Sequence, residues 1–276
     1  AFVEAALASA LDQTRAADEI VVIDDGSTDG SAARIAAAAA RSAGRIRFVA
    51  RERRGAAATL NEAFSMSRGD WIAILNSDDR FAPGRLETMS VGVAGAGASW
   101  GCSRVECIDP RDCILAQGVD ARVDAVRELQ DRVASADSVG MAFVAGNPAI
   151  STGALFVSRA LFDRVGGFRD LRFVHDWDFC LRASMVDEPV FVPEPLYLYR
   201  IHGANTIAAG ASANAEADDL LREFYRSAQS RSGAPNPFAP LPSVWGRVFW
   251  LRAIEGGHAA LLPSGVVERL ADELAA

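Results

Sequence analysis

The chain of 276 residues contains no lysine, so all 28 of its basic residues are arginines. A Walker A phosphate loop needs a lysine after its glycines, and pyridoxal phosphate enzymes need one for their Schiff base. Both classes of protein are therefore excluded. So is any mechanism that depends on a lysine as the base.

Positive charge is also in short supply. The 36 acidic residues outnumber the basic ones, which gives a formal charge of -8 and an isoelectric point of about 5.0. Such a chain has no global field that would attract nucleic acid or anionic lipid. We therefore expect no nucleic-acid partner, and any anionic ligand must be held by a local site.

Cysteine and long apolar runs are scarce as well. No pair of cysteines forms a C-x-x-C motif, which argues against zinc and thioredoxin-type sites and fits a reducing cytosol. The four thiols are Cys102, Cys107, Cys113 and Cys180. No stretch reaches the ~18–20 apolar residues of a membrane span. Residues 1–11 carry Glu4 and no basic residue, so they do not resemble a secretory signal.

What the chain does have is a regular alternation of strands and helices. Strand, loop and helix follow one another three times in the first 90 residues, with strands expected at 19–23, 46–50 and 71–75. This order is typical of a parallel, doubly wound sheet, in which ligands bind beyond the carboxyl ends of the strands. Two acidic pairs, Asp24–Asp25 and Asp78–Asp79, stand at such ends.

Further elements are expected along the chain. The predicted strands lie at 98–108, 154–157 and 190–192. The predicted helices lie at 2–14, 31–43, 56–66, 121–136, 159–165, 175–183 and 245–276, and another begins with Pro83 at its first position.

Adjacent carboxylates such as Asp78 and Asp79 repel each other unless a cation lies between them and a ligand. Their hard oxygens suit Mg²⁺ or Mn²⁺, although Asp79 is equally able to cap a helix. The loop after Asp25 is either a binding loop or a helix cap. Asp176 stands in the first turn of an expected helix, which favours a carboxylate, and Asp178 is expected to be a solvated or capping acid.

Taken in order, these segments resemble the family 2 glycosyltransferases, which have the GT-A fold. The matching stretches are 6–14, 19–30 (EIVVIDDGSTDG), 69–79 (GDWIAILNSDD), 152–156 (TGALF), 165–168 (VGGF), 175–178 (HDWD) and 199–202 (YRIH). Each motif alone is weak, but their joint order and spacing are specific. The resemblance covers residues 1–207.

The resemblance implies an α/β fold of the GT-A type, a doubly wound mixed sheet found in nucleotide-diphospho-sugar transferases, with a helical C-terminal tail. It implies an inverting transferase that moves a sugar from a nucleotide-diphosphate donor to a hydroxyl acceptor. The acceptor would be a glycan or a lipid-linked molecule of cell-envelope biosynthesis. At the donor site, Asp25 would contact the base, Asp78 the ribose, and Gly153 the nucleotide sugar.

The same resemblance assigns the remaining roles. Asp79 and His202 would hold Mg²⁺ or Mn²⁺, and Asp176 would be the catalytic base. Asn76 stands where many members have the first acid of their D-x-D motif. Family members also begin with an apolar strand ahead of the first helix, which this chain lacks, so we expect it to be part of a longer protein.

Two regions are expected: a glycosyltransferase domain at 1–207 and a helical extension at 208–276, with a Pro-rich linker at 230–242. The tail is expected to dock on the domain through Trp245, Val248, Phe249 and Leu251. A cytoplasmic location follows from the lack of a signal or span, and peripheral association with the inner face of the membrane is compatible with it.

Three alternatives compete with this interpretation. The first is a nucleotide-sugar-binding module without turnover, which would bind donor and not hydrolyse it. The second is a dinucleotide-dependent oxidoreductase, suggested by Gly95, Gly97 and Gly101, but Trp100 breaks the G-x-G-x-x-G spacing. The third is a sugar-nucleotide pyrophosphorylase, whose catalytic lysine this chain lacks.

Overall fold

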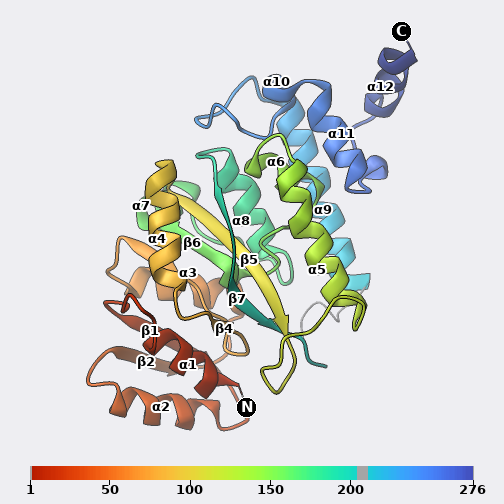
Figure 1. The fold of residues 1–276 in the computed structure, drawn as a ribbon. Helices are drawn as coiled ribbons and strands as arrows, with labels where there is room; N and C mark the ends of the chain where they lie inside the picture. Colours follow the sequence, from red (N-terminus) through yellow and green to blue (C-terminus); the bar gives the residue numbers. More distant parts are fainter. Residues whose placement is uncertain (1, 204–210, 276) are drawn as a thin grey trace.

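The computed structural model describes residues 2–203 and 211–275 and has a mixed α/β architecture (Figure 1). Its strands are β1 (Ile20–Asp25), β2 (Ile46–Arg51), β3 (Trp71–Ala73), β4 (Arg80–Phe81), β5 (Trp100–Ile108), β6 (Leu155–Ser158) and β7 (Val190–Arg200). Its helices are α1 (Val3–Leu11), α2 (Ser31–Arg41), α3 (Ala56–Met66), α4 (Arg85–Ala96), α5 (Ala121–Asp131), α6 (Val139–Ala145), α7 (Arg159–Val165), α8 (His175–Ser184), α9 (Ala211–Ser230), α10 (Pro242–Trp245), α11 (Arg247–Glu255) and α12 (Val266–Ala275). Short 3₁₀ helices include η1 (Arg132–Ser135), η2 (Thr152–Ala154) and η4 (Ala259–Leu261).

The first two strands form a separate parallel pair. β1 and β2 align from Ile20 opposite Ile46 to Asp25 opposite Arg51. A small apolar core, built from Val3, Leu7, Ile35 and Ile46, joins this pair to α1 and α2. The parallel pairing of these two strands confirms the prediction from the sequence.

The third strand does not extend that pair. β3 pairs antiparallel with β6 at the edge of a five-stranded sheet with the order β3-β6-β5-β7-β4, in which β5 and β7 are parallel. The mixed sheet is confirmed, but the expectation that the first three strands share one parallel sheet is wrong. The residue pattern identifies each strand but not its partner, and the short β3 takes β6 as its neighbour instead of β1.

One apolar cluster occupies the space between the five-stranded sheet and the C-terminal helices. Trp100 of β5, Phe143 of α6 and Phe179 of α8 belong to it, together with Tyr225 of α9 and Phe249 of α11. All five are almost completely buried. Figure 1 shows α9 and α11 beside α6, on one flank of the sheet. The tail therefore packs on the domain, as expected.

Several elements differ from the expected bounds. β7 continues from Val190 to Arg200 through two prolines, because its pairing with β5 is irregular at Ser103–Val105, opposite that stretch. Pro83 precedes α4 and does not occupy its first helical position. Helix α6 was not predicted, whereas α9 lies within the extension at 208–276 that was expected to be helical. Among the described residues, no helix has the length and the apolarity required to span a membrane.

Candidate functional site

The acid pair follows β3, and its two members have different surroundings. Asp79 is buried, with 1% of its surface exposed. Its Oδ2 accepts hydrogen bonds from the hydroxyl of Tyr197 (2.6 Å) and from the amide of Asn76 (3.2 Å), and its Oδ1 accepts one from the backbone N–H of Arg200 (2.7 Å). Burial, and then the charge of Asp78, raise the pKa of Asp79 to about 7. Asp79 therefore fixes the turn from inside the protein.

Asp78 faces outward. Its side chain is 34% exposed, and its Oδ2 lies 3.0 Å from Nε2 of His202, whose side chain is 16% exposed. His202 was predicted to share a metal with Asp79. In the structure it contacts the adjacent Asp78 instead. Among the residues that the structure describes, no three His, Cys, Asp or Glu side chains form a metal-ligating group.

Arg200 holds this turn in place. Its side chain is almost fully buried, and its Nε donates to the carbonyl of Asp78 at 2.7 Å. The other end of the guanidinium reaches the loop after β5, where it binds the carbonyl of Asp109 (2.8 Å) and the carboxylate of Asp112 (2.5 Å). This role of Arg200 was not predicted from the sequence, although Arg200 lies in the same short motif as His202.

A turn around η2 connects the acid pair to α8. Asn76 donates to the hydroxyl of Ser151 at 2.8 Å, and the hydroxyl of the adjacent Thr152 lies 3.1 Å from Nε2 of His175. Two sets of polar contacts, joined by the peptide bond between Ser151 and Thr152, therefore link Asp79 to the first residue of α8. His175 itself is buried, and its Nδ1 has no partner among the described residues.

Gly153 provides close packing in this turn. A Cβ atom built on it would lie 1.8 Å from the hydroxyl oxygen of Tyr197. Its carbonyl accepts a hydrogen bond from Arg85 at 3.1 Å. The lack of a side chain at position 153 thus lets Tyr197 reach Asp79.

Asp176, the predicted base, lies in the first turn of α8 and is 8% exposed. Its Oδ1 accepts a hydrogen bond from the backbone N–H of Trp177 at 2.8 Å. Burial raises the pKa of Asp176, and the neighbouring His175 partly offsets this rise. The sequence placed this carboxylate at a helix start, and the structure confirms that position.

The prediction for Asp178 is wrong. Its side chain is completely buried, and it forms ion pairs with Arg169 and Arg182 instead of facing solvent. Arg182 also donates to the carbonyls of Val165 and Gly167 at 2.8 Å each. Two arginines thus neutralise a carboxylate that would otherwise be costly to bury, and they tie α8 to the turn after α7.

Asp25 lies at the end of β1, at the junction with α3. Its two carboxylate oxygens accept the backbone N–H groups of Arg54 and Gly55 at 2.8 Å each, and Arg51 forms an ion pair at 3.1 Å. Burial opposes ionisation of Asp25, but these hydrogen bonds outweigh it and lower the pKa. The carboxylate therefore anchors the start of α3.

Helix α3 connects Asp25 with the start of α8. Asn61, in the middle of α3, exchanges two hydrogen bonds with the backbone of Phe168, at 2.8 and 2.9 Å. The ring of Phe168 packs edge-on against His175, with the ring centroids 5.9 Å apart. Helix α3 thus joins Asp25 to the region around the start of α8. Polar contacts join the acid pair Asp78–Asp79 to the same region.

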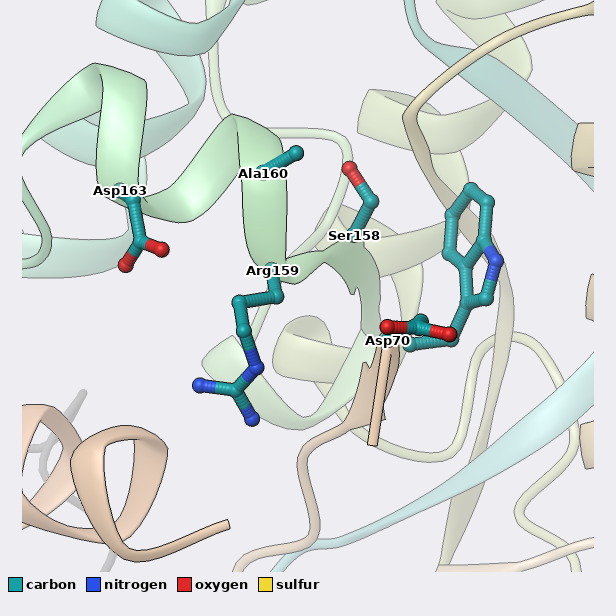
Figure 2. A pocket seen from close by; sticks show the side chains of 6 residues that line it. Asp70, Ser158, Arg159, Ala160 and Asp163 are labelled. Atoms are coloured by element: carbon teal, nitrogen blue, oxygen red, sulfur yellow. The ribbon is translucent and has the colours of Figure 1, made fainter. Parts of the chain in front are cut away.

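The two described cavities lie away from these residues. The larger, of about 440 Å³, is lined by Asp70, Trp71, Ser158, Arg159, Ala160 and Asp163 (Figure 2). The smaller, of about 180 Å³, lies between α1 and α2. Neither of these two cavities is lined by a predicted site residue.

The chain is similar in sequence to known glycosyltransferases. Residues 1–100 match the family described as Glycosyl transferase family 2. Over these residues the chain is similar to glycosyltransferase family 2. A curated protein to which the chain is similar is the succinoglycan biosynthesis protein ExoU of Rhizobium meliloti (strain 1021), which is 51% identical over 82 residues. That match covers 29% of this chain and 23% of ExoU, so the two share about a quarter of the relative's length.

Solved structures show that the chain has the predicted GT-A fold. S. aureus TarS 1–349 in complex with UDP-GlcNAc matches with a TM-score of 0.64 and 14% identity, over 96% of this chain and 79% of that one. The mannosyltransferase PcManGT from Pyrobaculum calidifontis, in complex with GDP-Man and Mn²⁺, matches with a TM-score of 0.60 and 20% identity, over 99% and 76%. At these identities the likeness establishes the fold alone.

Proposed function

We propose that this glycosyltransferase moves a sugar, with inversion, from a nucleotide-diphosphate donor to a hydroxyl of a glycan or lipid-linked acceptor in the synthesis of envelope polysaccharide. The observation that carries the proposal is the chain of polar contacts from the acid pair after β3, through Asn76 and Ser151–Thr152, to His175 and Asp176. The names of its relatives support it, since ExoU is a succinoglycan biosynthesis protein and TarS is in complex with UDP-GlcNAc.

A divalent cation fits the exposed side of the acid pair. Asp78 offers a carboxylate oxygen, the kind of donor that Mn²⁺ and Mg²⁺ prefer, and His202 offers an imidazole nitrogen beside it. Asp79, the ligand expected from the sequence, fits less well because its oxygens already accept three hydrogen bonds from the protein. When bound, the cation stabilises the charge on the leaving diphosphate. Asp78 and His202 would hold it, and Asp79 would keep Asp78 oriented.

Asp176 serves as the base in this scheme. Its buried position raises its pKa, and a carboxylate with a raised pKa accepts a proton more readily from an alcohol. It would remove the proton of the acceptor hydroxyl as that oxygen attacks the sugar. A single displacement of this kind inverts the configuration at the reacting carbon. Asp25 would lie beside the base of the donor, and Gly153 beneath its sugar diphosphate.

The experiment is a screen of UDP-, GDP- and dTDP-sugars for hydrolysis and transfer, with Mn²⁺, with Mg²⁺ and with EDTA. We expect turnover of at least one donor, stimulated by a cation and abolished by EDTA. Asp78→Ala should abolish the stimulation, whereas Asp218→Ala, an exposed carboxylate on α9, serves as the matched control and should keep it.

Two outcomes contradict the proposal. Donor binding without hydrolysis or transfer would favour the inactive binding module. Equal turnover in EDTA and in Mn²⁺ would remove the cation from the scheme.

A cytoplasmic location, at the inner face of the membrane, is part of the proposal and is open to test by fractionation of cells.

A further inference from the structure

Helix α8, which carries Asp176, starts without a capping side chain of its own. Its N-cap residue is Val174, which has no side chain able to accept a hydrogen bond, and the structure records no side-chain cap from it. Helix starts leave several backbone N–H groups without helical partners, so these groups need acceptors from elsewhere. The loop that leads into α8, residues 170–174, faces the same need.

For residues 172–174 of this loop, the acceptor comes from α9, about forty residues later in the chain. One oxygen of the Glu216 carboxylate accepts the N–H of Arg172 at 2.8 Å. The other accepts the N–H of Phe173 at 2.6 Å and that of Val174 at 3.1 Å. A single side chain thus binds three consecutive backbone donors immediately before His175 and Asp176. Hydrogen bonds to an ionised carboxylate are among the stronger ones in proteins.

A second link from the same face of α9 reaches the same helix. Glu223 lies two helical turns after Glu216, so the two side chains project in similar directions. Glu223 binds Arg169 at 2.9 Å, and Arg169 in turn pairs with the buried Asp178 of α8. Leu220 and Leu221, between the two glutamates, are buried in the main apolar cluster. Helix α9 is therefore fixed in the core, and its side chains Glu216 and Glu223 bind the loop before α8 and Arg169.

We propose that Glu216 is a positioning residue for Asp176: by binding the N–H groups of residues 172–174, it fixes the start of α8 and with it the direction of the Asp176 carboxylate. This role presupposes that Asp176 is the base, as proposed above. Asp176 is in the first turn of the helix, so a shift of the preceding loop moves its carboxylate directly. A base must lie within hydrogen-bond reach of the proton that it removes. A small displacement of the Asp176 carboxylate should therefore lower the rate of transfer more than it weakens the binding of the donor.

The test compares Glu216→Ala, Glu216→Gln and the control Asp219→Ala in the full chain. Asp219 is an exposed acid on the same helix, so its removal changes the charge equally. Hydrogen exchange of the amides of residues 172–174 is measured without any substrate, and kcat and KM for the donor are measured in the transfer assay.

We expect Glu216→Ala to accelerate exchange at residues 172–174 and to lower kcat by about tenfold or more, while the KM for donor changes by less than about twofold. Glu216→Gln keeps one carbonyl oxygen, which is able to accept from Phe173 and Val174, so its kcat should be intermediate. Asp219→Ala should match the wild type in both measurements. If the alanine variant fails to fold, the glutamine variant carries the test.

Three results overturn the inference. Unchanged exchange in Glu216→Ala would mean that the carboxylate does not hold the loop. Faster exchange with an unchanged kcat would leave Glu216 a purely structural residue. A glutamine variant as slow as the alanine variant would refute the hydrogen-bond geometry as the cause. Lack of turnover in the wild type would instead refute the proposed function and this catalytic role with it, and the exchange data would still show whether the contact forms.

Discussion

At the scale of single residues, Asp176 combines a buried carboxylate with a place in the first turn of α8. Asparagine has nearly the same shape and accepts no proton from an alcohol. We expect Asp176→Asn to reduce transfer by about 10²–10⁴-fold and to leave the dissociation constant of the donor nearly unchanged. Transfer assays quenched at timed intervals measure the rate, and calorimetric titration with the donor measures its dissociation constant.

Asp163→Asn is the matched control for that variant, since Asp163 is an exposed carboxylate on α7 at the edge of the larger cavity. It should transfer sugar at the wild-type rate. Transfer at nearly the wild-type rate by Asp176→Asn would remove Asp176 from the mechanism.

Gly153 offers a second prediction, about stability. An added methyl group would lie 1.8 Å from the Tyr197 hydroxyl, which donates to Asp79, so Tyr197 must move away. We expect Gly153→Ala to lower the free energy of unfolding by about 1–3 kcal/mol, the usual effect of overpacking. Urea denaturation measures the change.

Gly95→Ala is its control, because an added methyl group at this position, near the C-terminal end of α4, meets no described atom within 4 Å. This variant should be as stable as the wild type or more stable by about 0.5–1 kcal/mol, since alanine favours a helix. Equal stability of Gly153→Ala and Gly95→Ala would show that position 153 has room for a side chain.

The sequence placed the acids at the strand and helix ends but did not distinguish between neighbours. Asp78 and Asp79 are indistinguishable by local pattern, and the partners that bury one of them, Tyr197 and Arg200, lie about 120 residues later. Asp178 was misjudged although one partner, Arg182, lies four residues later in the same helix, because the other, Arg169, lies outside that helix. Burial of a carboxylate depends on long-range partners that no local pattern reveals.

At the scale of elements, the bounds of a helix were predicted correctly where one residue determines its end. The bounds of α7 were predicted correctly because Gly166, at φ 85°, ends the helix in the left-handed conformation. Helix α6 was missed because nearly all of its residues are buried, so it lacks the polar face of an amphipathic helix. β7 was cut short in the prediction because Pro193 and Pro195 normally interrupt a strand.

The junction of β1 and α3 gives a prediction on pH. The pKa of Asp25 is lowered below its ordinary value of 3.8, so its contribution to folding is complete above that value and is lost as the pH falls through the lower, folded-state pKa. We expect Asp25→Asn to cost about 1–2 kcal/mol of unfolding free energy at pH 7. The difference from the wild type should shrink as the pH falls below 3.8. Urea titrations at several pH values measure it.

Asp18→Asn, at an exposed acid in the loop before β1, provides the comparison. Its difference from the wild type should be small and should not vary over the same pH range. A constant cost of Asp25→Asn from neutral to acidic pH would mean that the ionised carboxylate does not stabilise the junction.

At the scale of the whole molecule, the pairing of strands was the least predictable feature. Periodicity identifies a strand but not its partner, and β3 takes β6, whose residues lie more than eighty positions later, as its neighbour. The two sheets and their separate apolar cores follow from this choice. Only tertiary packing decides between the possible pairings of such a short strand.

The division into a domain at 1–207 and an extension at 208–276 is a prediction that the shared core makes testable. Tyr225 of α9 is fully buried, and its hydroxyl donates to the carbonyl of Val144 at 2.9 Å and lies 2.7 Å from Nδ1 of His258. Phe249 of α11 is equally buried, in the same cluster as Trp100 of the sheet. A chain cut after residue 207 would expose the faces that these side chains cover.

We therefore expect the fragment 1–207 to lack a cooperative unfolding transition and to bind a hydrophobic dye, because much of its core would face water. In the full chain, Phe249→Ala should lower the unfolding free energy by about 3–5 kcal/mol while a single transition persists, whereas Phe238→Ala, at an exposed ring in the Pro-rich segment, should change it little. Thermal unfolding followed by circular dichroism distinguishes these cases. A fragment that unfolds cooperatively near the midpoint of the full chain would show that the C-terminal helices are a separate unit, and two transitions in Phe249→Ala would lead to the same conclusion.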